Sequence, residues 1–154
     1  MIRIIAIVML LATISSAAEE TKPDLKQFAN NYFSKMVASQ APDASAKALE
    51  EYLSLLTDDV GHTHLPWQTD DSRLADGKAS MREGMTFYLG AHTEYDAELL
   101  NVFVFNDSAI AIRYIHSAKG IDPQTKQAIE YTSTMMEVLE MEGDKIAVIR
   151  KYHE

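Results

Sequence analysis

Two histidines one residue apart, His62 and His64, stand in the segment DDVGHTHLPW, which runs from Asp58 to Trp67. On a strand both imidazoles would face the same side, because side chains at i and i+2 share a face. Such a pair can begin a metal site, but zinc needs at least a third protein ligand. The other histidines stand singly, and no cysteine or carboxylate cluster completes a ligand set. The sequence therefore predicts no metal here, and it leaves one imidazole of the pair on the outer face or in the turn.

Acid–base chemistry is the second possibility for this segment. An unperturbed imidazole has a pKa near 6.5, which is close to the optimum for a general base at neutral pH. A third histidine, His116, is in phase with Ile110, Ile112 and Tyr114 on a predicted strand. If that apolar face lines the interior, His116 points inward and an acid–base pair becomes possible. The alternative is a histidine at the strand end, hydrogen-bonded or in water.

Three further side chains are candidates for binding a ligand. Trp67, the single tryptophan, follows Pro66 on a loop and would bury a large apolar area if it covered a pocket. It could equally pack on the first helix as a plug. Met135 and Met136 would form a soft, adaptable lining if they face inward, although methionines also serve as ordinary core filling.

The elements that must position these residues follow from the period of the apolar residues. An apolar stripe with spacings of three and four, which includes Tyr32, predicts a first helix from about residue 22. Asp43 is a plausible N-cap of a second helix, and Ser80 with Glu83 forms a capping box for a third, over about 81–91. After residue 93 the period becomes two, and Asn106-Asp107 marks a tight hairpin. Helices followed by antiparallel strands predict an α+β fold.

This order of elements, together with LLTDDVGHTHLPW, DGKASMREGMTFYL and VLEMEGDKIAVIRKYHE, resembles the SnoaL-like, nuclear transport factor 2-like superfamily. The resemblance covers nearly the whole mature chain. It implies a cone in which three N-terminal helices pack against a strongly bent antiparallel sheet, with an apolar pocket at the open end. The superfamily includes ketosteroid isomerase, scytalone dehydratase, polyketide cyclases, epoxide hydrolases and binding modules, so the fold does not select a function.

The resemblance also suggests roles for single residues. Counting from the Asp58-Asp59 turn places His64 where the isomerases carry their base, and it leaves His62 turned away. Tyr32, on the apolar face of the first helix, corresponds to the hydrogen-bond donor of these enzymes. Alignment to the Gly-Asp-Lys turn puts Met136 where they carry a protonated acid. That half of the oxyanion hole would be missing, which argues against ketosteroid isomerase activity.

The amino terminus predicts export. Arg3, an apolar run over 4–14 and small residues up to Ala18 follow the order of a signal peptide, with cleavage before Glu19. The chain has no cysteine, which suits a periplasmic or secreted protein and excludes disulfides. Residues 19–154 are enough for one domain with its own core. The net charge of −9 disfavours nucleic acids and anionic membrane surfaces as partners.

The sequence therefore predicts an exported domain that binds a small, largely apolar molecule without a cofactor. Tyr32, His64, Trp67 and His116 are its main pocket candidates. The alternative is a cofactor-independent isomerase, dehydratase or cyclase with His64 as general base and Tyr32 as hydrogen-bond donor. A second alternative is an interaction module whose cone is filled with side chains. We expect a homodimer under each of these hypotheses.

Overall fold

The structure is a computed structural model that describes residues 24–154. Its three helices are α1 (Leu25–Gln40), α2 (Ala46–Leu53) and α3 (Gly77–Tyr88). The Asp24 side chain caps α1, and Ser45, two residues after the predicted Asp43, caps α2. None of the helices within residues 24–154 is long and apolar enough to cross a membrane. The predicted signal peptide, residues 1–18, lies outside the described residues.

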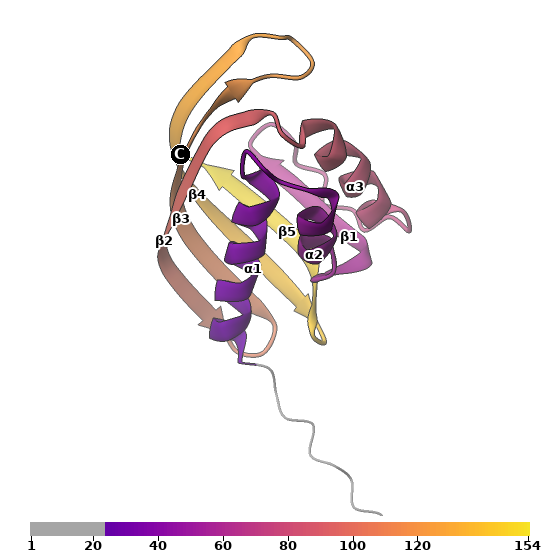
Figure 1. The fold of residues 1–154 in the computed structure, drawn as a ribbon. Helices are drawn as coiled ribbons and strands as arrows, with labels where there is room; N and C mark the ends of the chain where they lie inside the picture. The colour runs from indigo at the N-terminus through magenta and orange to yellow at the C-terminus, as the bar shows by residue number, and fades with distance from the viewer. Residues whose placement is uncertain (1–23) are drawn as a thin grey trace, which may run out of the picture.

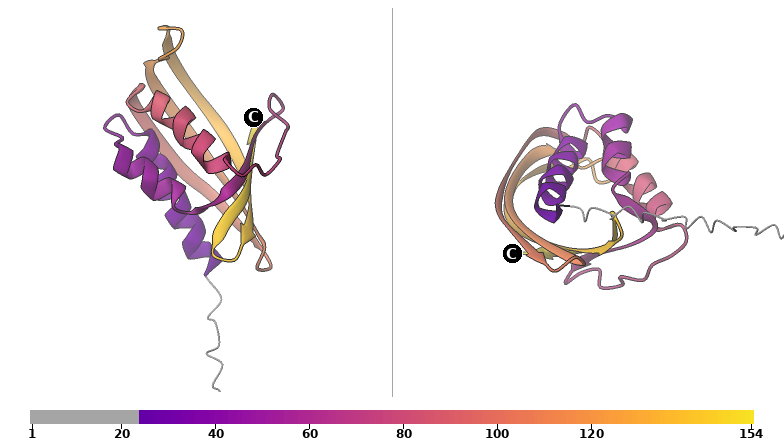
Figure 2. Two further views of the ribbon diagram at one scale, coloured as in Figure 1. Left: turned by 90° about the vertical axis from the view of Figure 1, so that its right-hand side faces the viewer. Right: turned by 90° about the horizontal axis from the view of Figure 1, so that it is seen from below.

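Five strands form one sheet in the order β1-β5-β4-β3-β2. They are β1 (Leu56–Leu65), β2 (His92–Phe105), β3 (Ala109–Ile121), β4 (Ala128–Glu142) and β5 (Lys145–His153). β1 runs parallel to β5 and the other neighbours are antiparallel, so the sheet is mixed rather than fully antiparallel. It bends around α1 and does not close, as Figure 2 shows from below. The predicted α+β cone is confirmed.

The hydrophobic core lies between the concave face of the sheet and the helices α1 and α2 (Figure 1). The predicted stripe of α1 buries Leu25, Ala29, Tyr32 and Met36 on one side of the helix. We call the concave face the inner face of the sheet. Alternate residues of each strand point to it, because the side-chain period of a strand is two. The strand residues of this core are Leu56, Val60, Ile110, Ile112, Tyr114, Met135, Leu139, Ile146 and Ile149.

The hairpin between β2 and β3 turns at the predicted residues. Asn106 has a φ of 47°, in the left-handed region that an asparagine tolerates. Its side-chain oxygen accepts a hydrogen bond from the Ser108 N–H at 2.9 Å. This local turn sets the long antiparallel pairing of β2 with β3, in which His116 lies opposite Ala97.

The third helix begins earlier than the sequence analysis predicted. α3 starts at Gly77, before the predicted start at Met81, and the Ser80–Glu83 box lies inside it. Gly77 allows this start because a Cβ there would come within 2.4 Å of the Val60 carbonyl oxygen. The backbone of α3 therefore touches β1 closely at one end only.

α3 is held by partly buried methionines, Met81 and Met85, and by charged contacts at the surface. No residue of α3 is fully buried. The Lys78 ammonium lies 2.7 Å from the Asp58 carboxylate on β1, and the Arg82 guanidinium lies 2.5 Å from the Glu50 carboxylate on α2. Because these contacts lie at the protein surface, where water screens them, each adds little to the stability. α3 is the least tightly packed helix of the domain.

Candidate functional site

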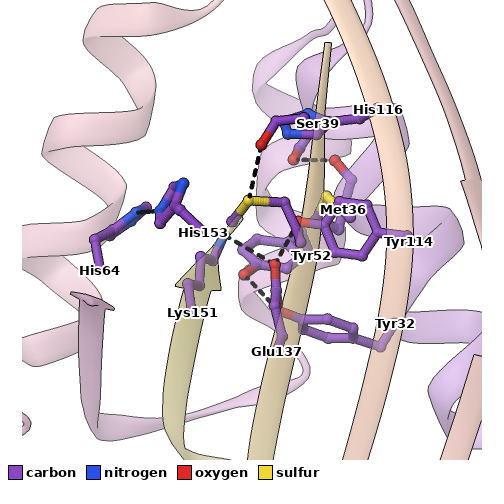
Figure 3. Close-up of polar contacts among 12 residues, drawn as sticks. Tyr32, Met36, Ser39, Tyr52, His64, Tyr114, His116, Glu137, Lys151 and His153 are labelled. Atoms are coloured by element: carbon purple, nitrogen blue, oxygen red, sulfur yellow. Dashed lines mark hydrogen bonds and ion pairs between the residues drawn. The ribbon is translucent and has the colours of Figure 1, made fainter. Parts of the chain in front are cut away.

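The centre of the inner face holds a carboxylate without exposed surface, that of Glu137 on β4. The Tyr32 hydroxyl on α1 donates to it at 2.5 Å, and the Tyr114 hydroxyl on β3 donates at 2.7 Å. The Lys151 ammonium on β5 lies 3.3 Å away. The Tyr52 hydroxyl on α2 is 3.3 Å from that of Tyr32 and completes what we call the buried cluster. Figure 3 shows these side chains converging from helices and strands.

The electrostatics of the buried cluster are those of a satisfied ion pair. Burial raises the pKa of the Glu137 carboxyl, but Lys151 and the tyrosine hydroxyls more than offset this and hold it below its ordinary value. Burial lowers the pKa of Lys151, and the Glu137 charge reverses that shift to a net rise. Burial, followed by the charge of Glu137, raises the pKa of Tyr32 and Tyr114. Both tyrosines therefore remain protonated donors at neutral pH.

A second polar group, the histidine cluster of His62, His64 and His153, lies at the edge of the inner face. The Nδ1 of His64 is 3.1 Å from the Nε2 of His153, so one ring donates to the other. The His62 ring meets the His64 ring edge-on at a centroid distance of 4.6 Å. In the register of β1 with β5, His64 lies beside Lys151. Lys151 thus separates the histidine cluster from Glu137.

The rings of this cluster are neutral at ordinary pH. Burial, followed by the positive charge of Lys151, lowers the pKa of His62 to about 2. The same causes, in the same order, lower the pKa of His64 to about 4. Burial and Lys151 also lower the pKa of His153. A neutral imidazole offers one acceptor nitrogen and one donor nitrogen to whatever lies beside it.

A groove of about 550 Å³ runs between β1, the loop 66–76 and α3. Both His62 and His64 line it. The Nε2 of His62 is buried and has no hydrogen-bond partner. Such orphaned nitrogens are uncommon in folded proteins and call for an explanation. The complete lining is Val60, His62, His64, Gln68, Asp70, Ser72, Leu74, Asp76, Gly77, Ser80, Met81, Gly84, Met85 and Tyr88.

The two residues predicted to act together lie in different regions. Tyr32 belongs to the buried cluster and has no exposed surface, whereas His64 lines the groove. Figure 3 shows them on opposite sides of the Glu137–Lys151 pair. His62 was expected to turn away, but it shares the groove with His64. β1 already begins at Leu56, so both histidines lie well inside the strand and on one face of it.

The predicted ligand-binding residues are scattered. Trp67 is 74% exposed, with its ring edge-on to His153. His116 is half-buried on the inner face, where its Nδ1 lies 3.4 Å from the Tyr95 hydroxyl. Met135 is buried in the core, but Met136 lies on the outer face of β4, 39% exposed. Met136 therefore does not line the cone, contrary to the expectation from the sequence.

Glu137 and Lys151 were not among the predicted site residues. Alignment to the turn at Gly143 had put Met136 at the acid position. The pairing of β4 with β3 is regular along this stretch, so side chains alternate without interruption, and Met135 and Glu137 face inward while Met136 faces outward. Glu137 is the residue that points inward, and its carboxylate does meet the predicted hydroxyl donor, Tyr32. Glu137 lies two residues after Met135, so a strand places both side chains on one face, and this spacing was the evidence available in the sequence.

Residues that could hold a metal do not gather in the described part of the chain. No group of three or more histidine, aspartate or glutamate side chains within residues 24–154 has the arrangement of a metal site. The Nδ1 of His92, a possible third ligand in the sequence, instead lies 2.8 Å from the Gln40 carbonyl oxygen. The arrangement offers hydrogen bonds and apolar surface to a ligand.

No family model matches the sequence, and no curated protein matches it significantly. Solved structures do match its fold. A nuclear transport factor 2-like protein from Anabaena variabilis ATCC 29413 has a TM-score of 0.62 at 19% identity, over 91% of this chain and 96% of that one. A nuclear transport factor 2-like protein of unknown function from Exiguobacterium sp. 255-15 has a TM-score of 0.62 at 15% identity, over 82% and 97%.

A third similar structure is a protein with a ketosteroid isomerase-like fold from Catenulispora acidiphila DSM 44928, in complex with trimethylamine. Its TM-score is 0.57 at 9% identity, over 86% of each chain. At such low identities the likeness concerns the fold. The chain has the nuclear transport factor 2-like fold that its sequence predicted.

Proposed function

We propose that this chain is an exported domain that binds a small, largely apolar molecule in the groove between β1 and α3, without a cofactor. The observation that carries the proposal is the buried His62 Nε2, which has no partner at the wall of a groove of about 550 Å³. An unpaired buried polar group costs about 1–3 kcal/mol, and a turn of the His62 ring that brings this nitrogen to a ligand in the groove would recover that loss. Ligand sites are typically concave and apolar with a few such polar groups.

The remaining lining suits a small apolar molecule. Met81, Met85 and Tyr88 of α3 face Val60 of β1 across the groove. Methionine side chains adapt to irregular ligand shapes, and the tyrosine adds a large apolar ring. A small molecule is also bound by one protein of this fold, as its trimethylamine complex records.

Gly84 allows a direct test of the groove. It lies on α3 at the groove wall, and a Cβ added there would meet no atom within 4 Å. The variant Gly84→Phe therefore fills the groove without displacing the backbone, and Gly84→Ala is the matched control that leaves it open. We expect mass spectrometry of the protein purified from its native host to find a small apolar molecule with wild type and Gly84→Ala and to lose it with Gly84→Phe. Equal retention by all three would place the ligand elsewhere and overturn the proposal.

Catalysis is the alternative that His64 supports. A cofactor-independent isomerase, dehydratase or cyclase would use the His64 imidazole, which lines the groove, as general base. The pKa of His64, about 4, keeps it unprotonated at neutral pH but makes it a weak base. Tyr32, the expected donor, has no exposed surface and cannot touch a ligand in the groove. Binding without turnover therefore fits better. An activity that His64→Gln leaves unchanged would remove His64 as the base.

A homodimer is the partner that the outer face of the sheet supports. Phe103, Phe105, Ile115 and Met136 expose apolar surface there, the first two to 53% and 59%. Exposed apolar area of this kind is typical of an association surface. We expect light scattering to give a dimer for wild type and a monomer for Phe103→Glu. A monomeric wild type would contradict the dimer and also the alternative of a dimeric interaction module.

Export to the periplasm or the exterior is supported by the amino-terminal sequence alone. The order of Arg3, the apolar run and the small residues before Glu19 is that of a cleaved signal peptide. We expect amino-terminal sequencing of the protein from its native host to begin at Glu19, in the periplasmic or culture fraction. A cell-associated chain that still begins at Met1 would contradict export.

A further inference from the structure

The charged side chains that line the groove are all acidic. Asp70 and Asp76 belong to its loop side, and no lysine or arginine of the described residues lines it. The side chain of Asp76 precedes α3 and makes no capping hydrogen bond to the helix. Asp70 accepts the Ser72 N–H at 3.0 Å, and this hydrogen bonding lowers the pKa of its carboxyl. The groove thus carries negative charge at neutral pH.

Arg73 and Lys78, which belong to the segments beside the groove, are engaged with other carboxylates. The Arg73 guanidinium binds Asp59 at 2.8 Å and Glu142 at 2.7 Å. The Lys78 ammonium binds Asp58 at 2.7 Å. Because Arg73 and Lys78 belong to these pairs and do not line the groove, they leave its acidic character unchanged.

The histidines add hydrogen-bonding capacity and no charge. Burial and Lys151 lower the pKa of His62 to about 2 and that of His64 to about 4, so both rings are neutral at ordinary pH. The Lys151 ammonium lies behind them on β5, and the Glu137 carboxylate at 3.3 Å offsets part of its charge. The groove wall therefore combines neutral imidazoles with two carboxylates.

We propose that the groove selects a small apolar amine over an alcohol with the same hydrocarbon skeleton, and that it rejects the corresponding carboxylate. The ammonium group would lie between the loop carboxylates and the histidine wall, where it donates hydrogen bonds. The hydrocarbon part would lie against Met81, Met85 and Leu74. A carboxylate would bring like charges together and offer no donor to the acceptors of the wall. This inference rests on the proposed function, because it names the class of molecule that the groove binds.

Tyr88 supports the same ligand class from the other side of the groove. Its ring lines the groove from the last turn of α3. The face of an aromatic ring attracts a cation, because the ring carries negative charge density there. An amine is thus favoured by both walls, whereas a neutral alcohol gains only the apolar contacts and hydrogen bonds.

Three probes with one hydrocarbon chain test the proposal: octylamine, octan-1-ol and octanoate. Calorimetric titration at neutral pH and physiological salt measures each dissociation constant for the full mature chain. We expect octylamine to bind most tightly, octan-1-ol more weakly, and octanoate at least tenfold more weakly than the amine. Equal or tighter binding of octanoate to wild type would overturn the proposal.

Matched variants separate the groove from the general negative charge of the protein. Asp70→Asn with Asp76→Asn keeps the local turn and helix start, because asparagine serves both positions. An ion pair at the surface contributes little, so we expect octylamine affinity to fall about threefold for each aspartate. The control pair is Asp96→Asn with Asp43→Asn. Asp96 is exposed on β2, the strand at the far edge of the sheet from β1, and Asp43 is exposed in the turn before α2. An equal loss in the control would overturn the selectivity.

Gly84→Phe distinguishes failure of this inference from failure of the proposed function. If Gly84→Phe abolishes binding but amine and carboxylate bind equally to wild type, the groove binds a ligand and the charge selection is wrong. If no probe binds to wild type, or if all bind Gly84→Phe as well as wild type, the groove is not their site. That result would overturn the proposed function together with this inference.

Discussion

The buried cluster around Glu137 and the groove beside His62 lie along one bent sheet, yet they differ in the partners of their polar groups. Every polar group of the cluster is hydrogen-bonded or paired, from Tyr32 through Glu137 to Lys151. In the groove, the Nε2 of His62 has no partner and the ring borders open space. The polar groups of the buried cluster therefore have their partners without a ligand, whereas a polar group beside the groove does not.

This difference indicates where a ligand would gain most. A molecule that entered the cluster would have to displace hydrogen bonds already made in a low-dielectric core. A molecule in the groove has no such network to displace, and it would gain a hydrogen bond if the His62 ring turned its unpaired nitrogen toward it. Lys151 joins the two regions, since it pairs with Glu137 and lowers the pKa of His62 and His64. The cluster therefore supports the groove electrostatically while remaining closed itself.

Breaking the Glu137–Lys151 pair is the change with the largest expected effect. Glu137→Gln or Lys151→Met leaves a buried charge without its partner, and we expect a loss of about 3–5 kcal/mol in the free energy of unfolding. Urea unfolding measures this loss. Glu137→Leu combined with Lys151→Met should lose less than either change alone, because no unpaired charge remains. A loss below about 1 kcal/mol for both single variants would show that the cluster is not an essential part of the core.

Acid pH should affect the groove before the cluster. An imidazole in the unfolded chain titrates near pH 6.5, whereas the folded pKa of His62 is about 2. Between these values the unfolded state binds more protons, so stability falls as the pH decreases from about 6.5, by up to about 1.4 kcal/mol per pH unit for His62. His64 contributes less to this pH dependence of stability, because solvent screens its partly exposed ring. The pKa of Glu137 is lowered in the folded protein, so the stability that its charge contributes is lost only below about pH 4.3, where the carboxyl of the unfolded chain becomes protonated.

Urea unfolding between about pH 7 and 5 checks this order, with His62→Phe as the comparison. Phenylalanine has nothing to titrate, so the variant should lose stability less steeply than wild type over this range. Parallel curves for the two proteins would mean that His62 is not held neutral by its surroundings.

Removing the unpaired nitrogen of His62 should separate stability from binding. Phenylalanine fills a similar volume and leaves no buried polar atom, so we expect His62→Phe to gain about 1 kcal/mol of stability at neutral pH. Ligand binding should weaken in the same variant, because the hydrogen bond is lost. Thermal unfolding and titration with octylamine measure the two effects. A variant that is less stable by a similar amount would imply that His62 has a structural partner.

The smallest expected effect concerns the wall of the groove on α3. Gly84→Ala should raise the free energy of unfolding by about 0.5–1 kcal/mol, because alanine is the better helix former and the added methyl group meets open space. Urea unfolding is sufficient to detect this gain. Destabilisation would show that the helix packs against β1 more closely at this point than the structure indicates.

Much of the fold was predictable because its signals are local. The stripe that contains Leu25 and Met36 and the hairpin at Asn106 were read from the sequence, whereas β1 begins at Leu56, before the predicted turn at Asp58. The start of α3 was not predicted, because Gly77 is selected by contact with the Val60 carbonyl rather than by a capping motif. The placement of His62 was also wrong, because pairing with β5 extends β1 back to Leu56.

The candidate site was less predictable than the fold. Tyr32 was correctly placed on the buried side of α1, but its partner was assigned to the neighbour of Glu137. Glu137 is in phase with the buried Met135, whereas Met136 faces outward. The alternation did not by itself identify the inner face, because Met136 and Val138 on the other face are apolar as well.

The sequence by itself determined the order of helices and strands, the apolar stripes and the acidic surface, because these depend on neighbours within a few positions. Only the tertiary structure decided which polar groups meet. Tyr32 and Glu137 are 105 residues apart, and His64 and His153 are 89 apart. Such contacts depend on strand pairing and on the bend of the sheet. The same long-range geometry left one imidazole nitrogen of His62 without a partner beside an open groove.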